Sequence, residues 1–232
     1  MLDQLITLDQ ELLLTLNGSD SLFMDSLMWT LTQTSTWVPL LAGIIYILFK
    51  NQRPDICVGI IITAILLVLF TDQFSSSLCK PYFHRLRPTH TPELAMLVDV
   101  VNGYRGGLYG FFSSHAANTF GAAAFFTIIF RHSPTALLLF CWAMLSSYTR
   151  IYLGVHFPLD IICGALFGLF SGTLFGIVCM RLCRQKAPHC EYSSSIRTTS
   201  GYVKSNFSII FLMASVSMTY ALLRSVIVAG CL

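Results

Sequence analysis

Residues 55–77 read DICVGIIITAILLVLFTDQFSSS, a largely apolar run that is long enough to cross a bilayer as one helix. Similar runs fill much of the chain, and we expect spans at about 36–50, 55–77, 114–130, 134–152, 158–180 and 207–229. Of the 232 residues, 55% are hydrophobic and 11% are charged, whereas a soluble domain carries about 25% charged residues. The sequence therefore predicts an all-α protein, a polytopic transmembrane helical bundle of about six spans, and excludes an ordinary soluble globule.

The N-terminal segment has a different pattern from the spans. Residues 2–17 mix leucines with acidic residues at roughly helical spacing, which predicts an amphipathic interfacial helix that ends at Asn17-Gly18. Residues 21–35 are less apolar and either lie at the interface or extend the first span. We expect three parts: an N-terminal interfacial segment at 1–35, a transmembrane core at 36–182, and a polar loop with an additional C-terminal span at 183–232.

Basic residues are distributed unevenly between the two sides of the predicted bundle. The turns at 51–54 and 131–133 and the loop at 181–206 share one side, which holds Lys50, Arg53, Arg131, Arg181, Arg184, Lys186, Arg197 and Lys204. The positive-inside rule makes this side cytoplasmic, so the opposite side and both termini face outward. The orientation reverses if residues 21–35 form a separate span.

Three polar clusters lie at the ends of predicted spans. They are Lys80-x6-Arg87-Pro88, Phe112-Ser113-Ser114-His115 and Arg150-x5-His156-x3-Asp160. Ionisable groups are costly in hydrocarbon, so such clusters are candidates for function. The order of the spans brings four span ends to one face, where these side chains can converge. Their cations, imidazoles and single carboxylate suit the binding and attack of a phosphate group.

The first cluster supplies two cations of different kinds. Lys80 and Arg87 are seven residues apart, about two helical turns, and can point the same way. Pro81 and Pro88 nevertheless predict local bends. The Arg fork fits phosphate oxygens, and Lys acts as a compact charge. The alternative interpretation is an interfacial basic cluster, with His84 and Arg85, that touches lipid headgroups.

The second cluster opens a predicted helix, where unpaired backbone N–H groups and the helix dipole favour an anion. A phosphate there would meet a hydroxyl of Ser113 or Ser114 and the imidazole of His115. The alternatives are a serine that only caps the helix and a histidine that only lies at the interface.

In the third cluster, His156 and Asp160 are four residues apart, with Pro158 at the first position of the fifth span. The carboxylate can hold one imidazole nitrogen and leave the other free to attack. Alternatively, the pair is structural and Arg150 is an ordinary interfacial residue. A metal site is disfavoured, because the neighbouring cations repel a divalent ion.

In order and spacing, these motifs resemble the signature of the type-2 phosphatidic acid phosphatase family. That family is the integral-membrane branch of a superfamily with glucose-6-phosphatase, bacterial acid phosphatases and vanadium haloperoxidases. The resemblance implies that His156 is the nucleophile that forms a phosphohistidine and that Asp160 orients it. It also implies that His115 protonates the leaving oxygen and then activates water.

The same resemblance assigns phosphate binding to Lys80, Arg87 and Arg150, with hydrogen bonds from Ser113 and the Ser114 backbone, and it implies no metal or other cofactor. Two positions depart from the family pattern. Phe112-Ser113-Ser114-His115 stands where Pro-Ser-Gly-His is usual, and Thr149 replaces a serine. We expect Ser114 to tune substrate or rate rather than abolish activity.

An outward site at the membrane boundary suits a lipid phosphate as substrate and membrane lipids as partners. Small size, an acidic N-terminus and hairpin turns resemble bacterial members, which implies the inner (cytoplasmic) membrane and a site that faces the periplasm. Isoprenoid diphosphate or lipid A phosphate is favoured, and phosphatidylglycerol phosphate or phosphatidic acid stays open. Within the 89–112 loop, which we expect to gate entry, Arg105 and Tyr109 are candidate headgroup contacts.

Other classes of protein remain as alternatives. A non-catalytic phospholipid-binding or transport protein would keep the cations but needs no nucleophile, and a vanadate-dependent oxidase would share the anion pocket. No basic cluster interleaved with aromatic residues lies outside the spans, so nucleic-acid binding is not expected. The oligomeric state is not indicated by the sequence.

Overall fold

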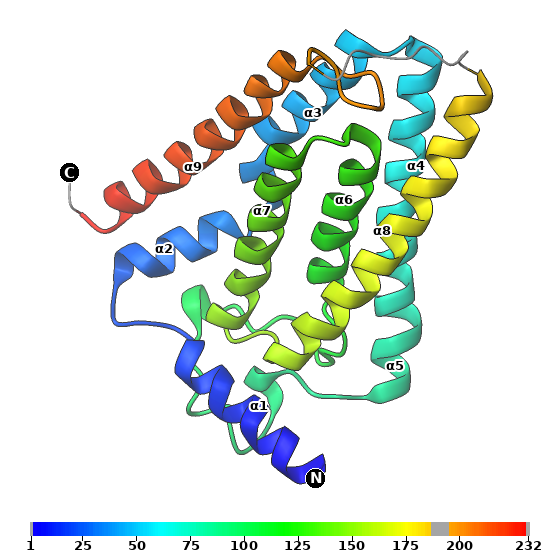
Figure 1. Cartoon of the computed structure of the whole chain (residues 1–232). Helices are drawn as coiled ribbons and strands as arrows, with labels where there is room; N and C mark the ends of the chain where they lie inside the picture. Colours follow the sequence, from blue (N-terminus) through cyan, green and yellow to red (C-terminus); the bar gives the residue numbers. More distant parts are fainter. Residues whose placement is uncertain (1, 187–194, 231–232) are drawn as a thin grey trace.

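The computed structural model describes residues 2–186 and 195–230, and side chains for all of these except Leu2 and residues 184–186. Within this part the chain is helical and contains no β-strand, which confirms the all-α prediction (Figure 1). The helices are α1 (Leu2–Leu16), α2 (Leu22–Leu31), α3 (Val38–Asn51), α4 (Pro54–Gln73), α5 (Lys80–Phe83), α6 (Ser114–Phe130), α7 (Ser133–Tyr152), α8 (Pro158–Lys186) and α9 (Ser208–Val228).

Two tight turns lie where the sequence predicts them. Helix α3 ends at Asn51 and α4 begins at Pro54, whose fixed backbone suits the first helical turn. At the next turn Arg131 takes a left-handed conformation with φ of 50° between α6 and α7. Helix α8 runs past the expected end at 180 to Lys186, so the polar loop begins later than predicted. Residues 187–194 of that predicted loop lie outside the described residues.

The helix that carries Lys80 ends before it reaches Arg87. Helix α4 continues through a π-helical stretch, Phe74–Cys79, into α5, and His84 then turns the chain with φ of 48°. Lys80 and Arg87 therefore do not lie on one continuous helix, and the predicted bend is present. A π-helical stretch of this kind rotates the following residues relative to a regular helix.

Helices α6 and α8 pack against each other at the centre of the bundle (Figure 1). Gly164, Gly168 and Gly172 line one face of α8 at intervals of one turn. A Cβ atom at these positions would collide with carbonyl oxygens of α6 or of its N-cap, Ser113. Glycine thus lets the two backbones approach closely. This contact places the first turn of α6 against the first turn of α8.

The remaining helices surround this central pair. Helix α9 packs on α2 and α3, and α1 lies across the ends of α7 and α8. Residues 21–35 fold as α2 and a short turn, and α2 is bent by 69° from the segment that holds α3. One face of α1 turns inward through Leu13, while Leu5, Leu8 and Leu12 are exposed. The predicted helix is thus present, and its place at a membrane interface stays a prediction.

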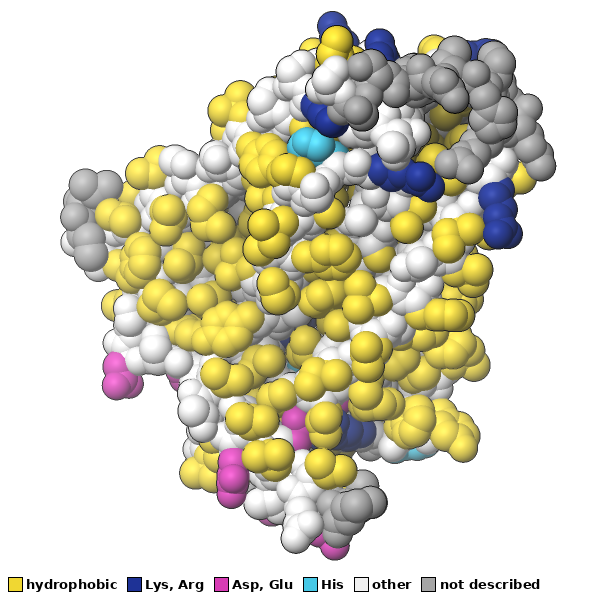
Figure 2. Space-filling view, viewed as in Figure 1, with side chains coloured by type: hydrophobic (Ala, Val, Ile, Leu, Met, Phe, Trp, Pro, Cys, Tyr) yellow, Lys and Arg dark blue, Asp and Glu magenta, His cyan; other side chains and the backbone are white. Residues whose placement is uncertain are grey.

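Three helical stretches of the described residues are long and apolar enough to cross a membrane: Pro54–Phe83, Pro158–Cys183 and Lys204–Val228. The bent pair of α2 and α3 raises the number to at most four. The predicted count of about six is therefore not confirmed, because α6 has only 17 residues and α7 ends in a polar turn. A broad apolar belt separates a basic end from an end with acidic side chains (Figure 2).

Candidate active site

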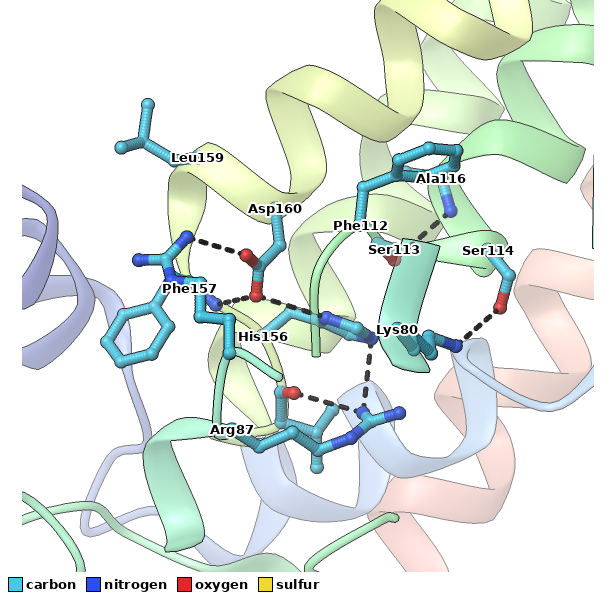
Figure 3. Close-up of polar contacts among 12 residues, drawn as sticks. Lys80, Arg87, Phe112, Ser113, Ser114, Ala116, His156, Phe157, Leu159 and Asp160 are labelled. Carbon is cyan, nitrogen blue, oxygen red and sulfur yellow. Dashed lines mark hydrogen bonds and ion pairs between the residues drawn. The ribbon is translucent and has the colours of Figure 1, made fainter. Parts of the chain in front are cut away.

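The structure brings the three polar clusters to one end of the bundle. Lys80 begins α5, His115 lies in the first turn of α6, Arg150 in the last turn of α7 and Asp160 in the first turn of α8. His156 lies in the connection between α7 and α8, with Lys80, Arg87 and Asp160 around it (Figure 3). The convergence predicted from the order of the spans is thus present.

His156 is a buried imidazole held at both ring nitrogens. Its Nδ1 lies 3.4 Å from Asp160 Oδ2, and its Nε2 lies 3.1 Å from Nη1 of Arg87. The same Nη1 donates to the carbonyl of Val155 at 3.0 Å. A carboxylate at Nδ1 and a cationic donor at Nε2 favour the tautomer with hydrogen on Nδ1. The Nε2 lone pair then faces the cationic side of the site.

The surroundings of His156 favour the neutral imidazole. Burial lowers its pKa well below 6.5, and the charges of Arg87, Arg150, Lys80 and His115 lower it further. The pKa of Arg87 is also lowered, by burial and by Arg150. At neutral pH the histidine therefore keeps the lone pair that a nucleophile needs.

The cations that face His156 have no carboxylate partners. Among the described residues, Lys80, Arg87 and Arg150 form no salt bridge. Lys80 donates to Ser114 Oγ at 3.3 Å, and Arg150 donates to Thr32 Oγ1 at 2.9 Å and to the hydroxyl of Tyr104 at 3.2 Å. Such a group of uncompensated cations attracts an anion.

The first turn of α6 adds a cap and an unpaired imidazole nitrogen. Ser113 is the N-cap, and its Oγ accepts the N–H of Ala116 at 3.4 Å. Its own N–H donates to the carbonyl of Asp160 at 3.0 Å, which joins α6 to α8. Nε2 of His115 is buried and has no hydrogen-bond partner within the described part of the chain. A buried polar atom of this kind is available to a ligand.

Sequence reasoning missed Arg85 and Asp9. Arg85 was placed with the headgroup cluster, but its Nη1 donates to Asp160 Oδ1 at 2.7 Å and its Nη2 to Asp9 Oδ2 at 2.5 Å. Asp9 is 2% exposed although its helix is largely solvent- or lipid-facing. The sequence signal for this burial is weak: Asp9 lies one helical turn before Leu13, so the two share a face of the helix. The structure shows that this face is buried.

The 89–112 loop contacts the site through a residue that the sequence did not single out. The ring of Tyr104 lies under Arg150, with 5.6 Å from the guanidinium carbon to the ring centroid. Burial raises the pKa of Tyr104, but the hydrogen bond from Arg150 and the charges of Arg150 and Arg87 together lower it below its usual value. Tyr109 packs on His84 instead. The headgroup contacts expected of Arg105 and Tyr109 stay predictions.

An apolar belt (Figure 2), together with a buried histidine beside three cations that form no salt bridge within the described residues, is the arrangement expected of a membrane phosphatase. The chain belongs to the PAP2 superfamily, which residues 57–186 match, and this range contains all three polar clusters. The family resemblance drawn from the motifs is thereby confirmed.

Two relatives share most of the chain. A lipid A 4'-phosphatase of Bacteroides thetaiotaomicron is 42% identical over 184 residues, which cover 78% of this chain and 81% of that protein. A lipid A 4'-phosphatase of Porphyromonas gingivalis is 37% identical over 171 residues, covering 74% and 72%. No solved structure matches the chain.

Proposed function

We propose that this membrane phosphatase hydrolyses the 4'-phosphate of lipid A at the outer face of the bacterial inner membrane, through a phosphohistidine on His156. The observation that carries the chemistry is the buried His156, which contacts Asp160 and Arg87 beside three cations that form no salt bridge within the described residues. The named activity of both relatives supports this substrate, and the matched segments cover at least 72% of each relative.

In the first step, Nε2 of His156 forms a bond to phosphorus while the bond from phosphorus to the lipid oxygen breaks. His115, which must be an imidazolium when the phosphate is bound, gives the proton on Nε2 to that oxygen and is left neutral. Lys80, Arg87 and Arg150 stabilise the charge on the phosphoryl oxygens, and the N–H groups at the start of α6 add donors. Asp160 stabilises the positive charge that develops on His156.

In the second step, water attacks the phosphorus of the phosphohistidine. His115, now without its proton, accepts one from the water, and the bond between phosphorus and Nε2 breaks. Inorganic phosphate leaves and His156 returns to its neutral form. The two imidazoles therefore have separate tasks, one as nucleophile and the other as acid and then base.

The test is phosphate release by detergent-purified protein in the presence of EDTA, wild type beside His156→Ala. The substrates are lipid A with both phosphates, lipid A with only its 1-phosphate, undecaprenyl diphosphate, phosphatidylglycerol phosphate and phosphatidic acid. We expect wild type alone to act, and to act on the first substrate but not the second. Equal activity on another lipid would reject lipid A as the preferred substrate, and activity of His156→Ala would reject the phosphohistidine.

The orientation needs a separate experiment. Asp20 is exposed in the connection between α1 and α2, which lies toward the site end of the bundle, and Asp55 is exposed in the first turn of α4, which begins at the opposite end (Figure 1). We expect a membrane-impermeant maleimide to label Asp20→Cys, but not Asp55→Cys, in intact spheroplasts, above the background of wild type. Labelling of Asp55→Cys alone would place the site in the cytoplasm.

A further inference from the structure

A buried carboxylate of the N-terminal helix reaches the beginning of α8. Asp9 Oδ1 accepts the backbone N–H of Leu159 at 2.9 Å, across 150 residues of sequence. Its Oδ2 is paired with Nη2 of Arg85 at 2.5 Å. Asp9 thus binds both the helix that carries Asp160 and the arginine that contacts Asp160. Its side chain is 1% exposed, so these contacts replace hydration rather than add to it.

Arg85 lies between the two carboxylates. Its Nη1 is 2.7 Å from Asp160 Oδ1, and its guanidinium carbon lies 4.4 Å from the centroid of the Phe157 ring. A planar guanidinium offers donors in fixed directions, so one arginine can hold two acids in a defined relation. Stacking on Phe157 restricts the remaining freedom of the side chain.

This arrangement divides the two oxygens of Asp160 between different tasks. Oδ1 accepts from Arg85, whereas Oδ2 accepts the N–H of Phe157 at 3.1 Å and faces Nδ1 of His156 at 3.4 Å. Without Arg85, Oδ1 would lose the cation that holds it, and the carboxylate would be free to rotate away from the imidazole. The contact at Oδ1 therefore keeps Oδ2 with the imidazole.

We propose that Asp9 and Arg85 are positioning residues of the active site, which act on the reaction by holding Asp160 and, through it, the tautomer and orientation of His156. Asp9 shares the charge of Arg85, so that Asp160 keeps enough negative charge to stabilise the cation that forms on His156. The inference rests on the proposed phosphohistidine chemistry and makes helix α1 part of the catalytic structure.

The test is a double-mutant cycle with steady-state kinetics on the lipid that wild type hydrolyses. Asp9→Asn keeps the size of the side chain and an oxygen that can accept from Leu159, but it removes the charge that faces Arg85. We expect kcat to fall about 10- to 100-fold with KM unchanged, because a misplaced group slows the chemistry without weakening binding. In an Asp160→Asn background, Asp9→Asn should lower kcat by less than about twofold, because Asp9 acts through Asp160.

The controls separate positioning from folding. Glu11→Gln makes the same kind of change at an exposed position of α1 and should leave kcat at the wild-type value. Arg85→Lys leaves Asp9 and its bond to Leu159 in place, and it replaces Asp9→Asn in the cycle if that variant unfolds in detergent. Asp9→Glu, which restores the charge, should recover part of the lost kcat.

Two results would overturn the inference while wild type remains active. One is a wild-type kcat in folded Asp9→Asn or Arg85→Lys, and the other is the same fold-loss with and without Asp160. An inactive wild type would instead reject the proposed function, so the two failures are distinguishable.

Discussion

The two sides of the site differ in whether their cations form salt bridges. On the acid-bound side, made of Asp9, Arg85 and Asp160, one arginine is held by two buried carboxylates. On the side proposed to bind phosphate, called here the phosphate-facing side and made of Lys80, Arg87 and Arg150, none of the three cations forms a salt bridge within the described residues. Arg85 and Arg87 are two residues apart in the chain. Residue type and local sequence therefore do not decide which cation is available to an anion; compensation by distant residues does.

The largest expected effect comes from breaking the phosphate-facing side. Arg87→Ala removes a buried cation that lies 3.1 Å from Nε2 of His156, the proposed nucleophile. We expect kcat/KM to fall about 10³-fold, the upper range for loss of one preorganised donor to a developing oxyanion. Purified variants assayed beside His156→Ala would show the size of the loss. Activity within a factor of ten of wild type would mean that Arg87 is not a phosphate ligand.

Breaking the acid-bound side by truncation should cost stability in addition to kcat. Arg85→Ala leaves two buried carboxylates without their shared cation, and one-sided loss of a buried pair is strongly destabilising. Because the Arg85 side chain is 26% exposed, we expect a loss of roughly 3 kcal/mol in the free energy of unfolding, which is about 6–12 °C in thermal midpoint for a chain of this size. Arg87→Ala should leave the midpoint unchanged or raise it, since it relieves repulsion from Arg150. Equal midpoints for the two alanine variants in detergent would remove the distinction between the two sides.

The smallest effect concerns the protonation of His156. Burial and the phosphate-facing cations lower its pKa well below 6.5, and a cation opposes formation of imidazolium. Removing Arg87 therefore raises this pKa, so the neutral nucleophile is lost at a higher pH than in wild type. Titration of the imidazole by NMR with ¹⁵N-labelled histidine, compared across wild type, Arg87→Ala and Arg85→Lys, measures the shift. We expect an upward shift in Arg87→Ala that is larger than any shift in Arg85→Lys. An unchanged value in Arg87→Ala would show that the cation does not act on the ring.

Much of the helix order could be predicted from the chain because it depends on local features. The apolar runs on either side of Pro54 and Pro134 predicted the two tight turns. The bounds of α6 and α9 agree with the predicted spans to within one residue. The errors lie where tertiary contacts prevail. Helix α8 extends to Lys186, and the helix that holds Lys80 stops at Phe83. The sequence analysis did not single out the glycine repeat of α8, because only its fit against α6 shows why it is needed.

The phosphate-facing residues were likewise visible in the sequence, because ionisable groups beside apolar spans stand out and their spacing matches a known family. The membrane class, and the prediction of phosphate chemistry at this site, follow from that pattern. The acid-bound side was not visible, since Asp9 lies in a helix with other acidic residues and Arg85 lies among other basic residues. Only the folded chain pairs them, because whether a charge is compensated depends on residues as far as 76 positions away. Burial makes that pairing decisive, since a buried charge without a partner is costly and one with a partner is held in place.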